Sequence, residues 1–218
     1  LRLTTNDHVE AFLELYGYWL GDASVSNNRC VTFQSNKRSD VAYLDGLLAR
    51  LPLTSDIDVT RTIDGVTASY CITNVNWCTY FAEQYNGSAI KMFWSWVWKR
   101  LGSRQCQLII RGLTLRFAED EQKDETRGKI YTSSTHFRDE LVQLILRAGH
   151  TAHFSRQFKK GDCDTIGREV TSDQWMVTYS ARFEEPIIRR EEIQRIPVKE
   201  DTPVWCVNVP TADHLIIM

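Results

Sequence analysis

The sequence predicts an α+β fold assembled from two similar αββ-type halves. Two apolar segments that contain glycine, residues 13–22 and 108–115, have the spacing of helices, and one begins each half. In both halves a strand-like segment, a second amphipathic helix and two further strands follow in the same order. Because the order of elements occurs twice, we expect a duplicated chain.

The elements of the first half follow from helix and turn signals. Asp7 can cap a helix that ends near Asp22, and residues 30–35 alternate as a half-buried strand does. A second helix is expected to open at Ser39 and to stop at Pro52, which has no N–H to continue it. The half is completed by strands at 57–62 and 66–73, joined by an Asp64-Gly65 hairpin turn, and by a helix at 76–85.

The second half repeats this order. Ser103 can cap a helix that runs through Leu115, and a charged loop follows it. Residues 128–133 read as a strand, and a helix is expected to open at Thr135 and to end at Gly149. Two further strands are expected at 150–158 and 174–181, separated by a loop around Gly161 and Gly167.

The repeat can be followed at a fixed offset of 98 residues. This offset aligns Phe33 with Tyr131, and it places Asp22 on Asp120. The offset and the order of elements together predict how the chain is divided. We expect a first half at 1–88, a linker at 89–102, a second half at 103–183 and an extension at 184–218.

The composition is that of an ordinary globular protein, with 43% hydrophobic and 25% charged residues. The net charge of −2 gives no global basic field that would announce a nucleic acid, although a total does not describe how charge is distributed. No apolar run reaches the roughly 20 residues that a membrane helix needs, and the N-terminus has no signal-peptide pattern. None of the six cysteines forms a CxxC pair, so we expect reduced thiols in an intracellular protein.

Trp94, Trp96 and Trp98 alternate in the expected linker. Such a row could form a stacking platform for single-stranded bases. Packing into the core, which would anchor the linker, is the favoured interpretation.

Three stretches carry a resemblance to a known family. They are Tyr16-Gly-Tyr-Trp-Leu-Gly-Asp22, residues 96–113, and residues 130–134 with 137–144. In this order and spacing they resemble the single-chain, two-motif LAGLIDADG homing endonucleases, and the second is similar to the linker and second motif of intein-borne members. The resemblance spans residues 9–182. It implies pseudo-twofold symmetry, two central motif helices and a saddle-shaped antiparallel sheet for DNA.

The resemblance also implies a function: a monomeric, site-specific endonuclease that makes a Mg²⁺-dependent double-strand cut in a long DNA target. The chemistry agrees, because a metal neutralises the charge that develops at phosphorus and lowers the pKa of the attacking water. Mg²⁺ prefers a few carboxylates together with water and phosphate oxygens. Glycines at 17, 21 and 112 would let the two motif helices approach closely. The candidate catalytic and metal-binding residues are Asp22, Glu119 and Asp120.

The second motif departs from the family pattern. Asp22 lies five residues after Gly17, but Phe117 lies five residues after Gly112, and phenylalanine can neither bind a metal nor move a proton. If residues 116 and 117 are a local insertion, Glu119 takes the role, whereas the 98-residue offset favours Asp120. A decayed second site, which would leave a nicking or inactive protein, is the third alternative.

Contacts to DNA are expected from the strands, since two-stranded ribbons fit the major groove. The alternative function is a catalytically impaired DNA- or RNA-binding protein of the same fold: a nickase, a maturase or an intein remnant. Residues 202–217 resemble a strand pair near the end of intein splicing domains. The candidate DNA-binding residues are Gln34, Lys37, Arg38, Arg61, Arg138, Arg156, Lys159, Lys160 and Arg182.

Overall fold

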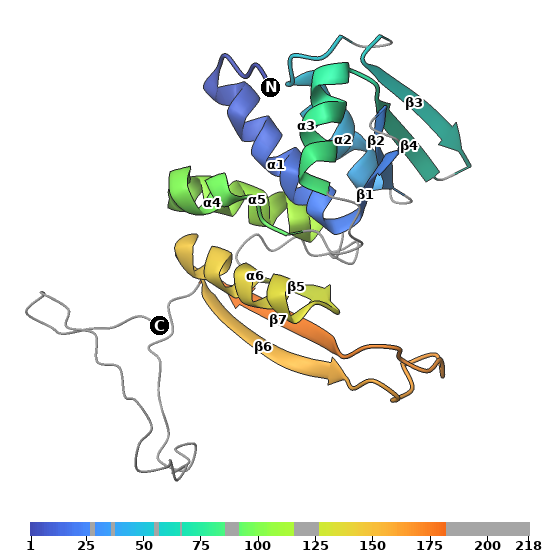
Figure 1. Ribbon diagram of the computed structural model, residues 1–218, viewed down its shortest axis with the longest axis vertical. Helices are drawn as coiled ribbons and strands as arrows, with labels where there is room; N and C mark the ends of the chain where they lie inside the picture. The colour runs from blue at the N-terminus through green and yellow to red at the C-terminus, as the bar shows by residue number, and fades with distance from the viewer. Residues whose placement is uncertain are drawn as a thin grey trace, which may run out of the picture. The chain divides into compact units, whose positions relative to one another are not determined.

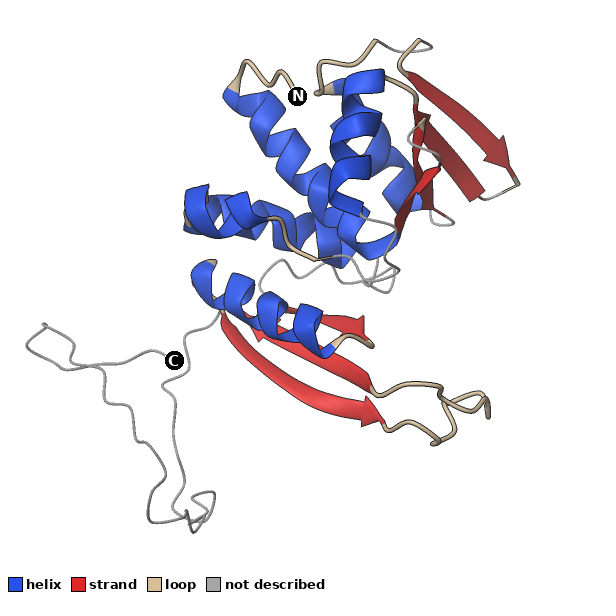
Figure 2. Ribbon diagram, in the orientation of Figure 1, coloured by secondary structure: helices blue, strands red, loops and turns tan. Residues whose placement is uncertain are grey.

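The computed structural model divides the chain into two units, residues 1–184 and 185–218. The residues it describes all lie in the first unit; they are 1–26, 29–35, 38–54, 57–65, 67–85, 92–115 and 127–181. Within this unit helices pack on antiparallel sheets, as the predicted α+β class requires (Figures 1 and 2). No helix among the described residues has the length and apolarity to cross a membrane.

The first half forms a four-stranded antiparallel sheet in the order β1-β2-β4-β3. The sequence did not predict β1, a four-residue strand that pairs with β2. Thr5 rather than Asp7 caps α1, because the Thr5 side chain accepts the His8 N–H at 3.1 Å. The elements are α1 (Asn6–Asp22), β1 (Ala23–Ser26), β2 (Cys30–Ser35), α2 (Arg38–Ala49), β3 (Val59–Asp64), β4 (Thr67–Ile72) and α3 (Val75–Tyr85).

The second half forms a three-stranded antiparallel sheet in the order β5-β7-β6, which repeats the order β2-β4-β3. Ser103 does not cap its helix as expected; the hydroxyl donates to the Ala148 carbonyl at 2.9 Å. The next helix begins at Thr135 as predicted, and Ser134 caps it by accepting from the Phe137 N–H. The elements are α4 (Ser95–Arg100), α5 (Ser103–Leu115), β5 (Arg127–Thr132), α6 (Thr135–Arg147), β6 (Thr151–Phe158) and β7 (Gln174–Ser180).

Burial corrects the offset between the repeated strands and helices from 98 to 97 residues. Phe33 is fully buried, whereas Tyr131, its partner at an offset of 98, is 46% exposed. Ile130, its partner at 97, is 1% exposed. Because neighbouring strand residues face opposite sides, an error of one residue inverts the pairing. At 97 residues Leu44, Leu47 and Leu48 align with Leu141, Leu144 and Ile145, and all six are buried.

The linker is anchored in the core of the first half, as the favoured interpretation of its tryptophans predicts. Trp94 is 4% exposed, and its backbone N–H donates to the Tyr16 hydroxyl at 3.0 Å. Its ring lies 4.5 Å from that of Tyr16 and 5.4 Å from that of Trp19, centroid to centroid. Trp96 packs on Tyr16 as well, and Trp98 packs on Phe93. These contacts leave no stacking platform at Trp94.

The cysteines depart in part from the expectation of reduced thiols. Cys30 and Cys71, on the neighbouring strands β2 and β4, are joined in a disulfide with their Cα atoms 5.8 Å apart. Cys78 and Cys106 are free and buried, and burial raises the pKa of both thiols. Cys163 is free and exposed.

Candidate functional site

The helices α1 and α5 touch through their backbones at two glycines. A Cβ atom placed on Gly17 would lie 2.1 Å from the Ile109 carbonyl oxygen, and one on Gly112 would lie 1.9 Å from the Glu14 carbonyl oxygen. Both distances are far shorter than van der Waals contact, so only glycine fits at either position. The prediction that Gly17 and Gly112 allow a close approach of the two helices is therefore confirmed.

The glycine contacts are reciprocal. The Gly17 position also faces the Leu113 nitrogen at 2.9 Å, and the Gly112 position faces the Tyr18 nitrogen at 3.0 Å. Gly112 follows Gly17 by 95 residues, and Leu113 follows Tyr18 by the same number. Gly17 and Gly112 are thus equivalent positions in the two helices.

The crossing lies near the C-terminal ends of both helices. Asp22, the last residue of α1, follows Gly17 by five residues, about 7.5 Å along the axis, and Leu115, the last residue of α5, follows Gly112 by about 4.5 Å. The fold therefore brings both helix ends close to one crossing point. The side chain of Asp22 lies outside what the structure describes, as do Glu119 and Asp120.

The described part of the chain contains no cluster of three or more His, Cys, Asp or Glu side chains that could hold a metal ion. That statement does not cover the predicted ligands, because the structure does not describe the side chains of Asp22, Glu119 and Asp120. Their role as metal ligands stays a prediction.

Helices cover one face of the four-stranded sheet, and no described helix covers the other, which we call its open face (Figure 2). Val31, Phe33, Tyr70 and Ile72 point to the covered face and are buried. The alternate positions form the open face, and the described strand residues there are uncharged apart from Asp64. The polar side chains on this face are Ser24, Ser26, Thr32, Gln34, Thr60, Thr62, Thr67 and Ser69.

The three-stranded sheet is covered by α6 and has an open face of different charge. The register aligns Lys129, Thr178 and His153 in one row across this face. Arg127 lies two residues before Lys129 on β5 and therefore on the same face, and no described strand residue on this face is acidic. The open face of this sheet is therefore basic, whereas that of the four-stranded sheet is not.

Of the predicted DNA-binding residues in strands, only Gln34 lies on an open face. Arg61 lies opposite Tyr70 on the helix-covered side, where its guanidinium is 3.3 Å from the Asp45 carboxylate. Arg156 lies opposite Trp175 on the helix-covered side of the other sheet and pairs with Asp173 at 3.2 Å.

Arg138 lies on α6, under the sheet rather than on its open face. Its guanidinium carbon is 4.4 Å from the Phe154 ring centroid and 4.2 Å from that of Trp175, and its side chain is 13% exposed. A cation held between two aromatic rings stabilises the packing of helix on sheet. Arg138 is thus placed as a packing residue of the second half.

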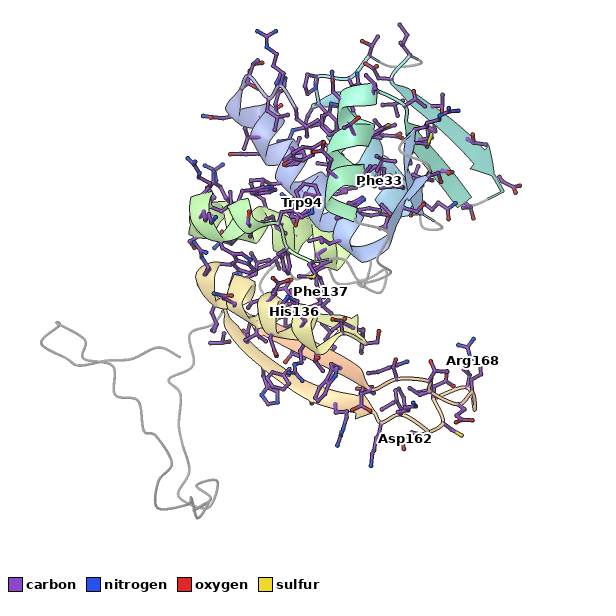
Figure 3. The ribbon with its side chains drawn as sticks, viewed as in Figure 1. Phe33, Trp94, His136, Phe137, Asp162 and Arg168 are labelled. Atoms are coloured by element: carbon purple, nitrogen blue, oxygen red, sulfur yellow. A yellow bond between two sulfur atoms is a disulfide. The ribbon has the colours of Figure 1, made fainter. Side chains whose placement is uncertain are left out.

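Lys159 and Lys160 lie in the loop between β6 and β7, whose far end carries Asp162 and Arg168 (Figure 3). Aspartates order this loop through backbone N–H groups: Asp162 accepts from Lys159, and Asp173 accepts from Lys160. The Lys160 N–H holds the pKa of Asp173 below its usual range. The loop is an ordered extension of the β6–β7 hairpin that carries two exposed lysines.

Three other predicted DNA-binding residues have no described side chain. Lys37 and Arg182 lie outside the described residues, and the side chain of Arg38 is not described.

Sequence reasoning missed the basic residues that the sheet does expose, Arg127, Lys129 and His153. The signal was present in β5, where Gly128, Ile130 and Thr132 alternate with larger polar side chains. Starting this strand at Arg127 and following the alternation would have assigned Arg127 and Lys129 to the open face.

Comparison with solved structures identifies this arrangement as the fold of the LAGLIDADG homing endonucleases. Among the matching structures are several of the homing endonuclease I-DmoI. A structure of an I-DmoI variant in complex with its target DNA and in the presence of manganese matches with a TM-score of 0.52 at 13% identity, over 80% of this chain and 89% of that chain. Mesophilic variants of I-DmoI match with a TM-score of 0.53 at 12% identity, over 80% and 90% of the two chains.

A further I-DmoI variant, bound to target DNA nicked in the coding strand, also matches with a TM-score of 0.53 at 12% identity. Identities this low establish the likeness of fold. No family model matches the sequence, and no curated protein matches it.

Proposed function

We propose that this chain is a site-specific homing endonuclease that cuts both strands of a long DNA target with a divalent metal. The observation that carries the proposal is the backbone contact of α1 and α5 at Gly17 and Gly112, because it brings the ends of both motif helices to one place. I-DmoI, whose fold this chain shares, is a homing endonuclease, and a variant of it forms a complex with its target DNA.

The two offsets favour one of the two candidates for the second acid. The motif helices align at 95 residues and the elements after them at 97, so two extra residues stand between Gly112 and β5. This agrees with an insertion of residues 116 and 117, after which Asp22 aligns with Glu119. The 98-residue offset that favoured Asp120 does not match the burial of the strands. We therefore assign the first ligand to Asp22 and the second to Glu119.

Carboxylate oxygens are the donors that Mg²⁺ prefers, so both assigned residues fit a hard divalent cation. The bound metal would supply charge neutralisation at the scissile phosphate and a more acidic water. The protein's own part is to hold the acids: Asp22 ends a helix that is fixed at Gly17 five residues earlier. DNA would lie on the open faces of the two sheets, one from each half of a pseudo-twofold monomer.

A second candidate, a nickase or a non-cleaving DNA- or RNA-binding protein of the same fold, is favoured by one observation. The residue five positions after Gly112, the glycine equivalent to Gly17, is Phe117. If Glu119 does not play in the second half the role that Asp22 plays in the first, one of the two cuts has no acid. An intein origin belongs to the same set of proposals, on the likeness of residues 96–113 and 202–217 to inteins.

The proposal is tested by selecting cleavable targets from a randomised DNA library with Mg²⁺ and then assaying a supercoiled plasmid that carries the best target. A linear product supports a double-strand endonuclease, and a product that stops at the nicked circle supports the nickase. Asp22→Asn should abolish double-strand cutting and leave DNA affinity unchanged. Glu10→Gln, in the first half of the same helix and paired with the exposed Arg104, is the matched control and should cut normally.

A further inference from the structure

Glu14 is a charged residue buried in the contact between the motif helices. It is 3% exposed, and its carbonyl oxygen is the atom against which Gly112 packs. Burial removes a carboxylate from water at high cost unless charges and hydrogen bonds replace the water. The groups that surround Glu14 therefore decide what this position does.

Helix α2, the residue just beyond it and helix α5 supply these groups. The Tyr43 hydroxyl of α2 donates a hydrogen bond to Glu14 Oε2. Arg50, just beyond α2, places Nη1 3.7 Å from Glu14 Oε1, and Arg111 of α5 places Nε 3.9 Å from Oε2. Burial, followed by the hydrogen bond to Glu14, raises the pKa of Tyr43. The tyrosine thus stays a neutral donor.

This carboxylate connects the two halves. Tyr43 and Arg50 belong to the first half, whereas Arg111 is the residue directly before Gly112 in the second. A buried charged cluster is weak evidence for stability, because an apolar replacement of equal volume is often as stable. It does restrict geometry, because every partner must keep its place relative to the carboxylate.

A second ion pair between the same helices provides a contrast. Arg104 of α5 lies 2.7 Å from Glu10 of α1, closer than either arginine approaches Glu14. The two side chains are 78% and 30% exposed, so water and salt screen the pair. Glu10 and Glu14 lie one turn apart on α1, and only the second is shielded from water.

We propose that Glu14 is a positioning residue that fixes the register of α1 against α5, and through it the spacing of the two metal-binding acids. This role rests on the proposed endonuclease function. The physical reason is distance: Glu14 lies eight residues before Asp22 on one rigid helix, and Arg111 lies eight residues before Glu119 in the sequence. A shift of α1 along α5 would move Asp22 by the same amount, and metal chemistry depends steeply on such shifts.

The test uses the full-length protein and a selected target. Single-turnover cleavage is measured against Mg²⁺ concentration for wild type, Glu14→Gln, Arg111→Gln, the double variant and Glu10→Gln. We expect Glu14→Gln and Arg111→Gln to cut about tenfold more slowly when the enzyme is in saturating excess over DNA, with a higher Mg²⁺ midpoint and a DNA Kd within about twofold of wild type. The double variant should be no slower than either single variant. Glu10→Gln should match wild type in rate and midpoint.

Other outcomes would overturn the proposal. A merely structural Glu14 would lower the rate only in proportion to the folded fraction, measured by circular dichroism at the assay temperature, and would leave the Mg²⁺ midpoint unchanged. A wild-type cleavage rate in Glu14→Gln would also overturn the proposal. If wild type cuts no target, the endonuclease function fails; the register claim is then judged from unfolding of the same four variants, where additive effects of Glu14→Gln and Arg111→Gln would contradict it.

Discussion

The two sheets share a strand order, but they expose different chemistry. The open face of the four-stranded sheet carries hydroxyls, one amide and the single carboxylate of Asp64, whereas that of the three-stranded sheet carries Arg127, Lys129 and His153. Charged contacts to phosphates release counterions and make the affinity depend on salt. Neutral groups can read base edges without adding to this salt dependence. If DNA lies on these faces as proposed, the second half supplies most of the electrostatic attraction and the first half reads bases with neutral groups.

The glycine crossing is what the two halves have in common, and breaking it should have the largest effect. We expect Gly17→Ala and Gly112→Ala each to lower the free energy of unfolding by about 3 kcal/mol or more, because the added methyl group overlaps a backbone carbonyl of the other helix. Chemical denaturation of each variant measures the change.

Gly46→Ala is the matched control for both substitutions. Gly46 lies in α2, and a Cβ atom there would meet nothing within 4 Å. Alanine should therefore stabilise the helix by about 0.5–1 kcal/mol. Equal effects at Gly46 and Gly112 would mean that the helices do not meet as described.

The charge difference between the sheets is tested by exchanging equivalent residues. Lys129 and Thr32 occupy the same position in the repeat, 97 residues apart, and both lie on open faces. Lys129→Thr should reduce the slope of log affinity against log salt by about 1, and Thr32→Lys should increase it by about as much. Binding titrations between low and moderate salt measure both slopes. Unchanged slopes would place the DNA elsewhere.

The smallest effect concerns the arginines beneath the sheets. Arg138 is held between Phe154 and Trp175, so Arg138→Ala should lower the free energy of unfolding by about 1–2 kcal/mol. Arg61 lies 5.7 Å from the Tyr70 ring centroid and pairs with a half-exposed Asp45, so Arg61→Ala should lower the free energy of unfolding by only about 0.5 kcal/mol. Thermal unfolding of both variants gives the comparison. If Arg138→Ala instead weakened DNA binding at unchanged stability, its assignment as a packing residue would be wrong.

Much of the fold could be predicted from periodicity, because apolar spacing and turn residues act locally. Strand β2 was found in this way. The close approach at Gly17 and Gly112 was predicted differently, from the small size of glycine in the two motif helices that the resemblance implies. Strand β1 was missed because four residues carry too little alternation to be recognised, although pairing with β2 stabilises them.

The candidate interface was predicted less well, for a physical reason. Arg61, Arg138 and Arg156 are strand-associated cations in the sequence, but aromatic rings and acids on distant elements hold them on the covered faces. Such pairings depend on tertiary structure, which local composition does not encode. The offset error had the same origin, because only burial distinguishes an alignment of 97 residues from one of 98.

The central claim is that α1 and α5 bring one acid from each half to a shared metal site, and that Glu119 is the acid of the second half. The most direct measurement is manganese- or magnesium-dependent cleavage of both strands of a selected target by Glu119→Gln and Asp120→Asn. We predict that Glu119→Gln loses double-strand cutting while binding DNA normally, and that Asp120→Asn cuts as wild type does. Loss of cutting in Asp120→Asn with full activity in Glu119→Gln would contradict the account.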